Sequence, residues 1–236
     1  MGDRLPDLAL MDTVIADFCA EVASEPLCYF SEADLQGLLF QRLMAAFPPQ
    51  VETAYARGPG AKGMYRTGLV HREYGATEGL RTDISVFAPA DVARIDSPNL
   101  QTRGKYLPPC FAVELGTEKT IDTAAHIQND LVKLERAKCR GYLVHFFRDV
   151  TRADVGTASR NRTEEKLDRI FRNHAAAIVA PANVKYLCFV LRIARSSKTI
   201  HGKCELLIPG SGMWRRTNLQ QVREAVLELL NETPAV

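Results

Sequence analysis

Two long apolar runs constrain the fold of this chain more than any other feature of its sequence. The first spans residues 141–147 (GYLVHFF) and the second spans residues 184–193 (VKYLCFVLRI). Successive side chains of a strand point to opposite faces of a sheet, so the nearly continuous first run suits a strand that is buried on both faces. We therefore predict an α/β fold with a central sheet flanked by helices.

Helical spacing and capping residues predict two helices at the start of the chain. Apolar residues recur at helical spacing over 8–22. A second helix is expected to begin after Ser31, whose hydroxyl and the carboxylate of Asp34 form the pattern of a capping box. Pro48 and Pro49 should end it, because proline cannot continue a helix.

Three strands, a helix and a fourth strand are expected next. Segments 68–74 and 81–88 are separated by a glycine-containing turn, which predicts a hairpin, and 110–115 forms the third strand. Apolar residues then follow a helical stripe over 121–138, before the strand at 141–147. A strand, a helix and a strand in this order imply a right-handed parallel crossover. The predicted order is α-β-β-β-α-β.

The rest of the chain is expected to extend this arrangement. We predict a helix near 163–178, strands at 184–193 and 204–208, and a last helix capped by Thr217 with Gln220. No linker composition separates the two parts. The chain should therefore form a single domain over 1–236, with a core at 31–147 and a C-terminal αββα extension at 148–236.

Charge is distributed unevenly along the chain. The 30 Lys and Arg residues nearly balance the 28 Asp and Glu residues, for a net charge of +2. Residues 1–50 nevertheless carry two basic and eight acidic residues, whereas residues 185–216 carry seven basic residues and one acidic residue. A local basic surface can contact a phosphate backbone even on a nearly neutral chain. Charge alone equally supports the alternative that the basic residues of 185–216 lie on a solvated strand face and hairpin.

Two carboxylates interrupt apolar strands. Asp83 lies within the apolar strand at 81–86, and Glu114 lies near the end of the strand at 111–116. An acidic side chain in such a place costs desolvation unless it is paired or binds a cation. Two carboxylates from neighbouring strands suit Mg²⁺ or Mn²⁺. The alternative for each is a strand-end ion pair with Arg81 or Lys119.

These residues and the order of elements resemble the PD-(D/E)XK nuclease superfamily, which has the restriction-endonuclease-like fold. The resemblance covers about 120 residues. Asp83 matches the metal-binding Asp of the second strand, Glu114 matches the acid of the (D/E)xK signature, and Glu32 fits the Glu of the first helix. The resemblance implies a Mg²⁺- or Mn²⁺-dependent nuclease that hydrolyses DNA in restriction, defence or repair.

One position departs from the signature. Gly116 stands where the family has its lysine, which positions the attacking water and offsets negative charge. Lys119, just past the strand, and Lys133, on the next helix, are the two candidate substitutes; a solvated helix position is an equal interpretation of Lys133. If neither reaches the site, the protein is a catalytically degenerate member that binds nucleic acid or a partner protein.

The resemblance also implies partners, and the sequence itself suggests a location. Seven basic residues are the candidates for DNA contacts: Arg57, Lys62, Arg66, Arg195, Lys198, Arg215 and Arg216. Double-strand cleavage by a single such site implies a homodimer, by family analogy. No run of 18 apolar residues is present, so no membrane span is expected. The first residues lack the pattern of a signal peptide, which favours the cytoplasm.

Overall fold

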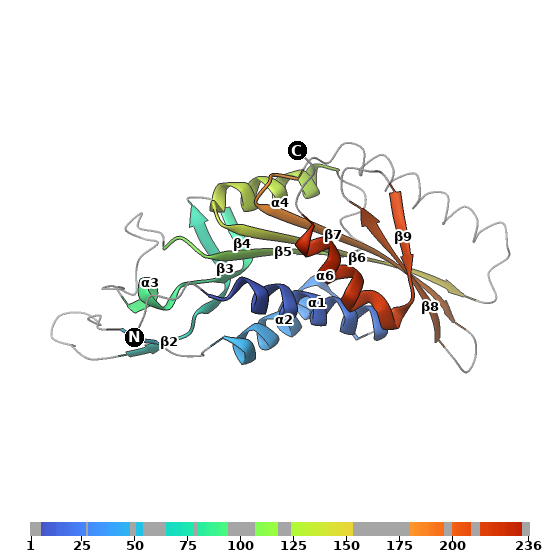
Figure 1. Cartoon of the computed structure of the whole chain (residues 1–236), viewed down its shortest axis with the longest axis horizontal. Coiled ribbons are helices and arrows are strands. Elements are labelled where there is room, and N and C mark those ends of the chain that lie inside the picture. The colour runs from blue at the N-terminus through green and yellow to red at the C-terminus, as the bar shows by residue number, and fades with distance from the viewer. Residues whose placement is uncertain are drawn as a thin grey trace.

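A computed structural model gives the arrangement of most of the chain. The residues that it describes are 6–26, 28–47, 51–53, 65–77, 80–93, 107–117, 124–152, 180–195, 200–208 and 213–232. Seven strands form one sheet, and helices cover both of its faces (Figure 1). The predicted mixed α/β fold is confirmed at this level.

The sheet follows chain order from one edge to the other. Its strands, in spatial order, are β3 (Val70–Thr77), β4 (Leu80–Val86), β5 (Phe111–Gly116), β6 (Arg140–Arg152), β7 (Val184–Arg195), β8 (Ile200–Ile208) and β9 (Met213–Thr217). The pairs β5–β6 and β6–β7 are parallel, and the other pairs are antiparallel. Two short strands, β1 (Val51–Thr53) and β2 (Tyr65–Thr67), form a separate antiparallel pair.

The helices cover the two faces unequally. They are α1 (Leu8–Ser24), α2 (Glu32–Ala46), α3 (Pro89–Ala93), α4 (Ala124–Ala137), the short 3₁₀ helix η3 (Leu219–Gln221) and α6 (Val222–Asn231). Figure 1 shows α1, α2 and α6 together on one face and α4 on the other. The larger apolar core lies between α1, α2, α6 and the sheet, and a smaller one lies under α4.

Alternation along β5 decides which side chains face α4. Phe111, Val113 and Leu115 point into the larger core, whereas Ala112 points into the smaller core under α4. Glu114 and Gly116 share the parity of Ala112, so they lie on the α4 face. The sheet therefore places a carboxylate against α4 at the end of a central strand.

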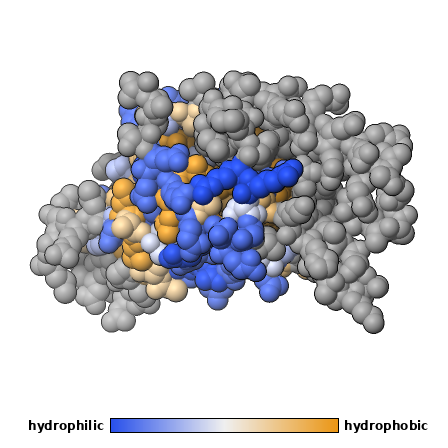
Figure 2. All heavy atoms as spheres, turned by 45° about the vertical axis from the view of Figure 1, so that its right-hand side comes forward, coloured by the Kyte–Doolittle hydropathy of each residue, from blue (hydrophilic) through white to orange (hydrophobic). Residues whose placement is uncertain are grey.

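Apolar side chains are mostly inside the molecule. In the face shown in Figure 2, hydrophilic residues cover much of the described surface, with smaller apolar areas beside them. Among the described residues, the large apolar side chains that remain exposed are Leu8, Phe30 and Val132. The apolar sequence runs have thus become the two cores, as their periodicity predicts.

The predicted start and end of α2 are confirmed. Ser31 accepts a hydrogen bond from the Asp34 backbone N–H, and the Asp34 carboxylate accepts one from the Ser31 N–H. The helix ends at Ala46, just before the two prolines. The cap predicted at Thr217 is wrong. This residue ends β9, and Asn218 instead caps η3 by accepting from the Gln221 backbone N–H.

Most of the predicted strands are confirmed, including the hairpin β3–β4. The strands before and after α4 in the sequence, β5 and β6, form the predicted parallel pair. The helix predicted near 163–178 lies outside the described residues. Strand β9 (MWRRT) was not predicted, because its two arginines break the apolar alternation that marks a strand. The single domain over 1–236, with its core at 31–147 and extension at 148–236, stays a prediction.

Candidate metal centre

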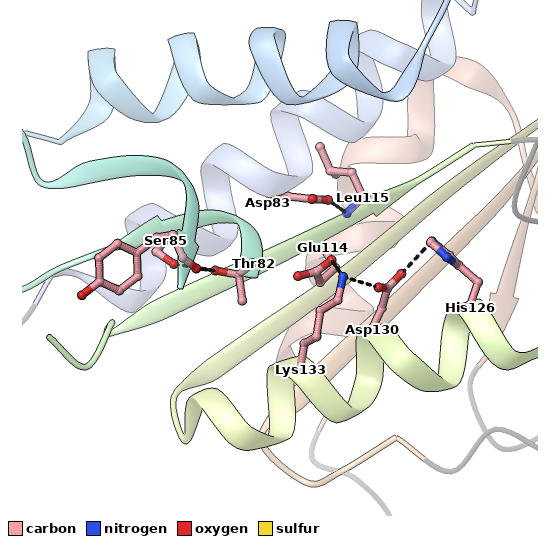
Figure 3. Close-up of polar contacts among 9 residues, drawn as sticks. Thr82, Asp83, Ser85, Glu114, Leu115, His126, Asp130 and Lys133 are labelled. Carbon is pink, nitrogen blue, oxygen red and sulfur yellow. Dashed lines mark hydrogen bonds and ion pairs between the residues drawn. The ribbon is translucent and has the colours of Figure 1, made fainter. Parts of the chain in front are cut away.

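Figure 3 shows five polar side chains around the end of β5, four of them between this strand and α4 and Asp83 beside Leu115. We call them the α4 cluster: Asp83 from β4, Glu114 from β5, and His126, Asp130 and Lys133 from α4. The three helix residues are spaced four and then three apart, which puts them on one side of the helix. They therefore face the strand ends as a group.

Lys133 connects the helix to the sheet. Its ammonium donates to Glu114 Oε2 over 2.9 Å and to Asp130 Oδ1 over 2.8 Å. His126 Nε2 lies 3.1 Å from the other oxygen of Asp130. Glu114 and Asp130 are each only 1% exposed, so one partly exposed lysine forms ion pairs with two buried carboxylates.

Asp83 is fixed at the end of β5. Its Oδ2 accepts a hydrogen bond of 2.7 Å from the Leu115 backbone N–H (Figure 3). The antiparallel ladder between β4 and β5 ends at the pair Ile84–Val113, and Asp83 and Glu114 are the next residues beyond it. The two carboxylates lie close enough for the charge of Asp83 to raise the pKa of Glu114.

Burial and like charges disfavour ionisation of these acids. Burial raises the pKa of Asp83 to about 7, although the hydrogen bond from Leu115 opposes the rise, and the charge of Glu32 adds to it. Burial, followed by the charges of Asp83 and Asp130, raises the pKa of Glu114 well above its usual value. Burial also raises the pKa of Glu32, which is half-buried beside the cluster.

Lys133 responds in the opposite sense. Burial lowers the pKa of its ammonium, but the attraction of Glu114 and Asp130 outweighs burial, and the pKa lies above its usual value. Lys133 therefore stays positively charged at neutral pH. A charged lysine donates hydrogen bonds and offsets negative charge, but it cannot accept a proton.

The donor set fits a hydrated divalent cation. Glu114 Oε1 is buried and has no hydrogen-bond partner, so one lone carboxylate oxygen is free to bind a cation. Over the described part of the chain, no three or more His, Cys, Asp or Glu side chains form a group that could hold a metal ion. Mg²⁺ typically binds through one or two carboxylates and keeps several waters, so Asp83 and Glu114 suit it better than they suit a closed zinc site.

The structure brings together three of the residues proposed from sequence: Asp83, Glu114 and Lys133. Glu32 lies near enough for its charge to raise the pKa of Asp83. Lys119, the other candidate lysine, lies outside the described residues. Sequence reasoning did not select His126 and Asp130. The available signal was their spacing on one amphipathic helix. Asp130 follows His126 by four residues and precedes Lys133 by three, which puts all three on one side of the helix.

The residues expected to contact DNA do not form a described basic surface. Arg57, Lys62 and Lys198 lie outside the described residues, and the side chains of Arg66 and Arg195 are also undescribed. The other two arginines make ion pairs. Arg215 lies 2.5 Å from Glu228, and Arg216 lies 3.2 Å from Glu205.

The comparisons with known proteins give a distant structural likeness. No protein-family model and no curated protein matches the chain. Among solved structures, a carbon-nitrogen hydrolase from Helicobacter pylori G27 is similar over 89% of this chain and 72% of that chain. The sequence identity is 11% and the TM-score is 0.32, values that assign no activity to this chain.

This result corrects the resemblance stated from sequence. The structure found is a carbon-nitrogen hydrolase and not a restriction-endonuclease-like protein, so the assignment to the PD-(D/E)XK superfamily is wrong. The restriction-endonuclease-like core, the DNA nuclease activity and the nucleic-acid-binding alternative are withdrawn with it. The physical reason is that short acidic motifs and an α-β-β-β-α-β order are compatible with more than one α/β fold.

None of the described helices has the length and apolar character needed to cross a bilayer.

Proposed function

We propose that this chain is a divalent-cation-dependent hydrolase whose centre is the α4 cluster, with Asp83 and Glu114 as ligands of Mg²⁺ or Mn²⁺. The observation that carries the proposal is Glu114. Its carboxylate is 1% exposed and one of its oxygens has no hydrogen-bond partner. Burying a charge without full pairing costs free energy, and a cation at this oxygen offsets that cost.

The charges around Glu114 support the same proposal. Glu32, Asp83, Glu114 and Asp130 influence one another electrostatically, and Lys133 is the one lysine that acts on them among the described residues. This excess of carboxylates adds to burial in raising the pKa values of Glu32, Asp83 and Glu114, and so disfavours their charged forms. A divalent cation supplies two positive charges where this excess lies.

The residues of the cluster then have separate roles. Asp83 and Glu114 hold the cation from two adjacent strands, and Glu32 stands beside them as a further carboxylate. A divalent cation held there would supply activation of a water for hydrolysis. Lys133, which stays protonated, donates hydrogen bonds and stabilises the negative charge that develops on the substrate. Asp130 holds the Lys133 ammonium in place through its 2.8 Å contact.

Cation binding is tested by calorimetric titration of the full chain with MnCl₂. We expect saturable binding by the parent, and affinity at least about tenfold lower in Asp83→Asn and in Glu114→Gln. Glu228→Gln is the matched control, because this carboxylate pairs with Arg215 on the surface, away from the cluster. A parent that binds no Mn²⁺, or ligand variants that bind as tightly as Glu228→Gln, contradicts the proposal.

Hydrolysis is tested with the same four proteins. Chromogenic carboxylic esters, anilides and phosphate monoesters present three kinds of bond to a metal-activated water. We expect turnover of at least one class to require Mg²⁺ or Mn²⁺, and to be lost in Asp83→Asn and Glu114→Gln but kept in Glu228→Gln. Turnover that survives removal of the cation with a chelator contradicts the cation-dependent mechanism.

A further inference from the structure

His145 is a buried polar residue that the fold does not satisfy. It lies on β6, its exposed fraction is 0%, and neither of its ring nitrogens has a hydrogen-bond partner. Buried polar groups in folded proteins are nearly always hydrogen-bonded, and an unsatisfied one typically indicates a bound water, an ion or a functional role. The cost of leaving both nitrogens unpaired therefore needs an explanation.

The ring of His145 lies directly over Gly116. The two residues are partners in the parallel β5–β6 ladder. A Cβ atom on Gly116 would fall 2.3 Å from His145 Nε2, which means that the imidazole occupies the space of the missing side chain. Glu114 lies two residues earlier on β5, and therefore on the same face of the sheet. His145 is thus a neighbour of the α4 cluster on the next strand.

Aromatic rings hold the imidazole from the other sides. The ring of Phe147 meets it edge-on with a centroid separation of 5.8 Å, and the ring of Tyr186 does so at 6.1 Å. These contacts fix the orientation of the ring but satisfy neither nitrogen. Burial lowers the pKa of His145 to about 3, so the ring is neutral and keeps one donor nitrogen and one acceptor nitrogen.

The unsatisfied atoms on this face belong to neighbouring residues. Among the described side chains, Glu114 Oε1 and both nitrogens of His145 are buried without a hydrogen-bond partner on the α4 face of the sheet. A buried water generally makes two to four hydrogen bonds to such groups. No described group of three ligands could hold a metal directly, which favours an indirect contact for His145.

We propose that His145 is a positioning residue of the metal centre, and that its imidazole hydrogen-bonds to a water carried by the cation at Asp83 and Glu114. This inference rests on the proposed function. It assigns a role to Gly116 as well, since only glycine leaves room for the ring. The role differs from packing, because a packing residue does not respond to the cation.

The first test uses the unmodified protein. The ¹⁵N resonances of the imidazole rings are followed while the full chain is titrated with MgCl₂. We expect those of His145 to shift and to saturate at the Mg²⁺ concentrations that calorimetry gives for cation binding. His71 is the internal control, because its Nε2 already contacts the Gly68 carbonyl at 3.0 Å and its resonances should not move.

The second test compares His145→Gln with His145→Phe. Glutamine keeps a donor and an acceptor, whereas phenylalanine keeps only the ring packing against Phe147 and Tyr186. We expect His145→Phe to weaken Mn²⁺ binding by about tenfold, the lower end of the effect of second-shell partners, and His145→Gln to recover most of it.

The two proposals fail in different ways. If Mg²⁺ binds to the parent but the His145 resonances do not move and His145→Phe binds Mn²⁺ normally, His145 is a packing residue and the hydrolase proposal survives. If the parent binds neither Mg²⁺ nor Mn²⁺, both proposals are overturned.

Discussion

The two faces of the central sheet treat buried polar groups differently. On the face covered by α1, α2 and α6, the Tyr142 hydroxyl donates to Asp12 Oδ1 over 2.6 Å, and Arg140 Nη2 lies 3.9 Å from the second oxygen. On the α4 face, Glu114 and His145 keep buried atoms with no partner. The Asp12 and Glu114 carboxylates are both buried, so burial alone does not distinguish them.

The difference teaches where to look for function. A satisfied polar group stabilises a unique packing, whereas an unsatisfied one costs stability and persists where a ligand completes it. The face with α1, α2 and α6 carries the larger core and the Asp12 carboxylate, both oxygens of which have a partner, although Arg140 Nε there has none. The α4 face carries the smaller core and an open set of donors and acceptors. The first face should therefore dominate stability, and the second should dominate cation binding.

The largest expected effect lies in the larger core. Phe146 is fully buried, stacks on Phe189 with a centroid separation of 4.9 Å and meets Phe18 edge-on. Phe146→Ala should lower the free energy of unfolding by about 3–5 kcal/mol in urea titrations. Phe30→Ala, at a position that is 90% exposed, should leave it nearly unchanged. Equal effects of the two variants would break the comparison.

The second effect is a pH dependence of stability that arises on the α4 face. The pKa of Asp83 is raised to about 7 in the folded protein from a usual value of 3.8. Between these values the folded state keeps a proton that the unfolded state has lost, so stability falls as pH rises from about 4 to about 7 and then levels off. At about 1.4 kcal/mol per pKa unit, the loss is at most about 4 kcal/mol.

Asp83→Asn removes this titration and serves as the reference for it. Urea unfolding of both proteins across the pH range, without divalent cations, should show the parent losing stability relative to Asp83→Asn toward neutral pH. A difference between the two that does not change with pH contradicts the burial of an ionisable Asp83.

The third effect compares the two buried carboxylates directly. Asp12→Ala leaves the Tyr142 hydroxyl without an acceptor and should cost about 1–3 kcal/mol of unfolding free energy. Glu114→Gln removes a buried charge and should leave stability at neutral pH within about 0.5 kcal/mol of the parent, or raise it. Denaturant titrations at low ionic strength measure both. A large loss in Glu114→Gln would mean that the α4 face is a structural ion-pair network.

The last comparison concerns two glycines, one on each face of the sheet. Gly116→Ala should cost about 1–3 kcal/mol, because the new Cβ overlaps the rigidly packed His145 ring. Gly37→Ala, inside α2 with open space around it, should gain about 0.5–1 kcal/mol. Thermal unfolding of both variants checks the signs. Replacement of His145 by alanine in the Gly116→Ala protein should recover most of the loss, since the two positions are in contact.

Local signals in the sequence predicted much of this fold. The Ser31–Asp34 capping box and the apolar strands depend on near neighbours, and they appear in the structure as predicted. The proximity of Asp83 and Glu114 was also foreseeable, since strands that are consecutive in the sequence usually lie side by side. Lys133 was one of two candidates for the lysine beside Glu114, and the structure places it there.

Other features depend on contacts that no local pattern encodes. The space over Gly116 is filled by His145 from the next strand, 29 positions later in the sequence, and nothing near Gly116 indicates this. The cap moved from Thr217 to Asn218 because β9 continues through Thr217 to pair with β8. The family resemblance was wrong because it weighted an order of elements and a few acids that several α/β folds share.

The central claim is that a divalent cation relieves the uncompensated charge on the α4 face. The most direct test is the free energy of unfolding, measured with and without saturating Mg²⁺ at neutral pH and constant ionic strength, for the parent and for Glu114→Gln. A ligand that binds only the folded state stabilises it by RT ln(1 + [L]/Kd), which is about 2.7 kcal/mol at 100 times Kd. We predict a gain of this kind in the parent and almost none in Glu114→Gln. Equal gains in the two proteins, or no gain in the parent, would contradict the account.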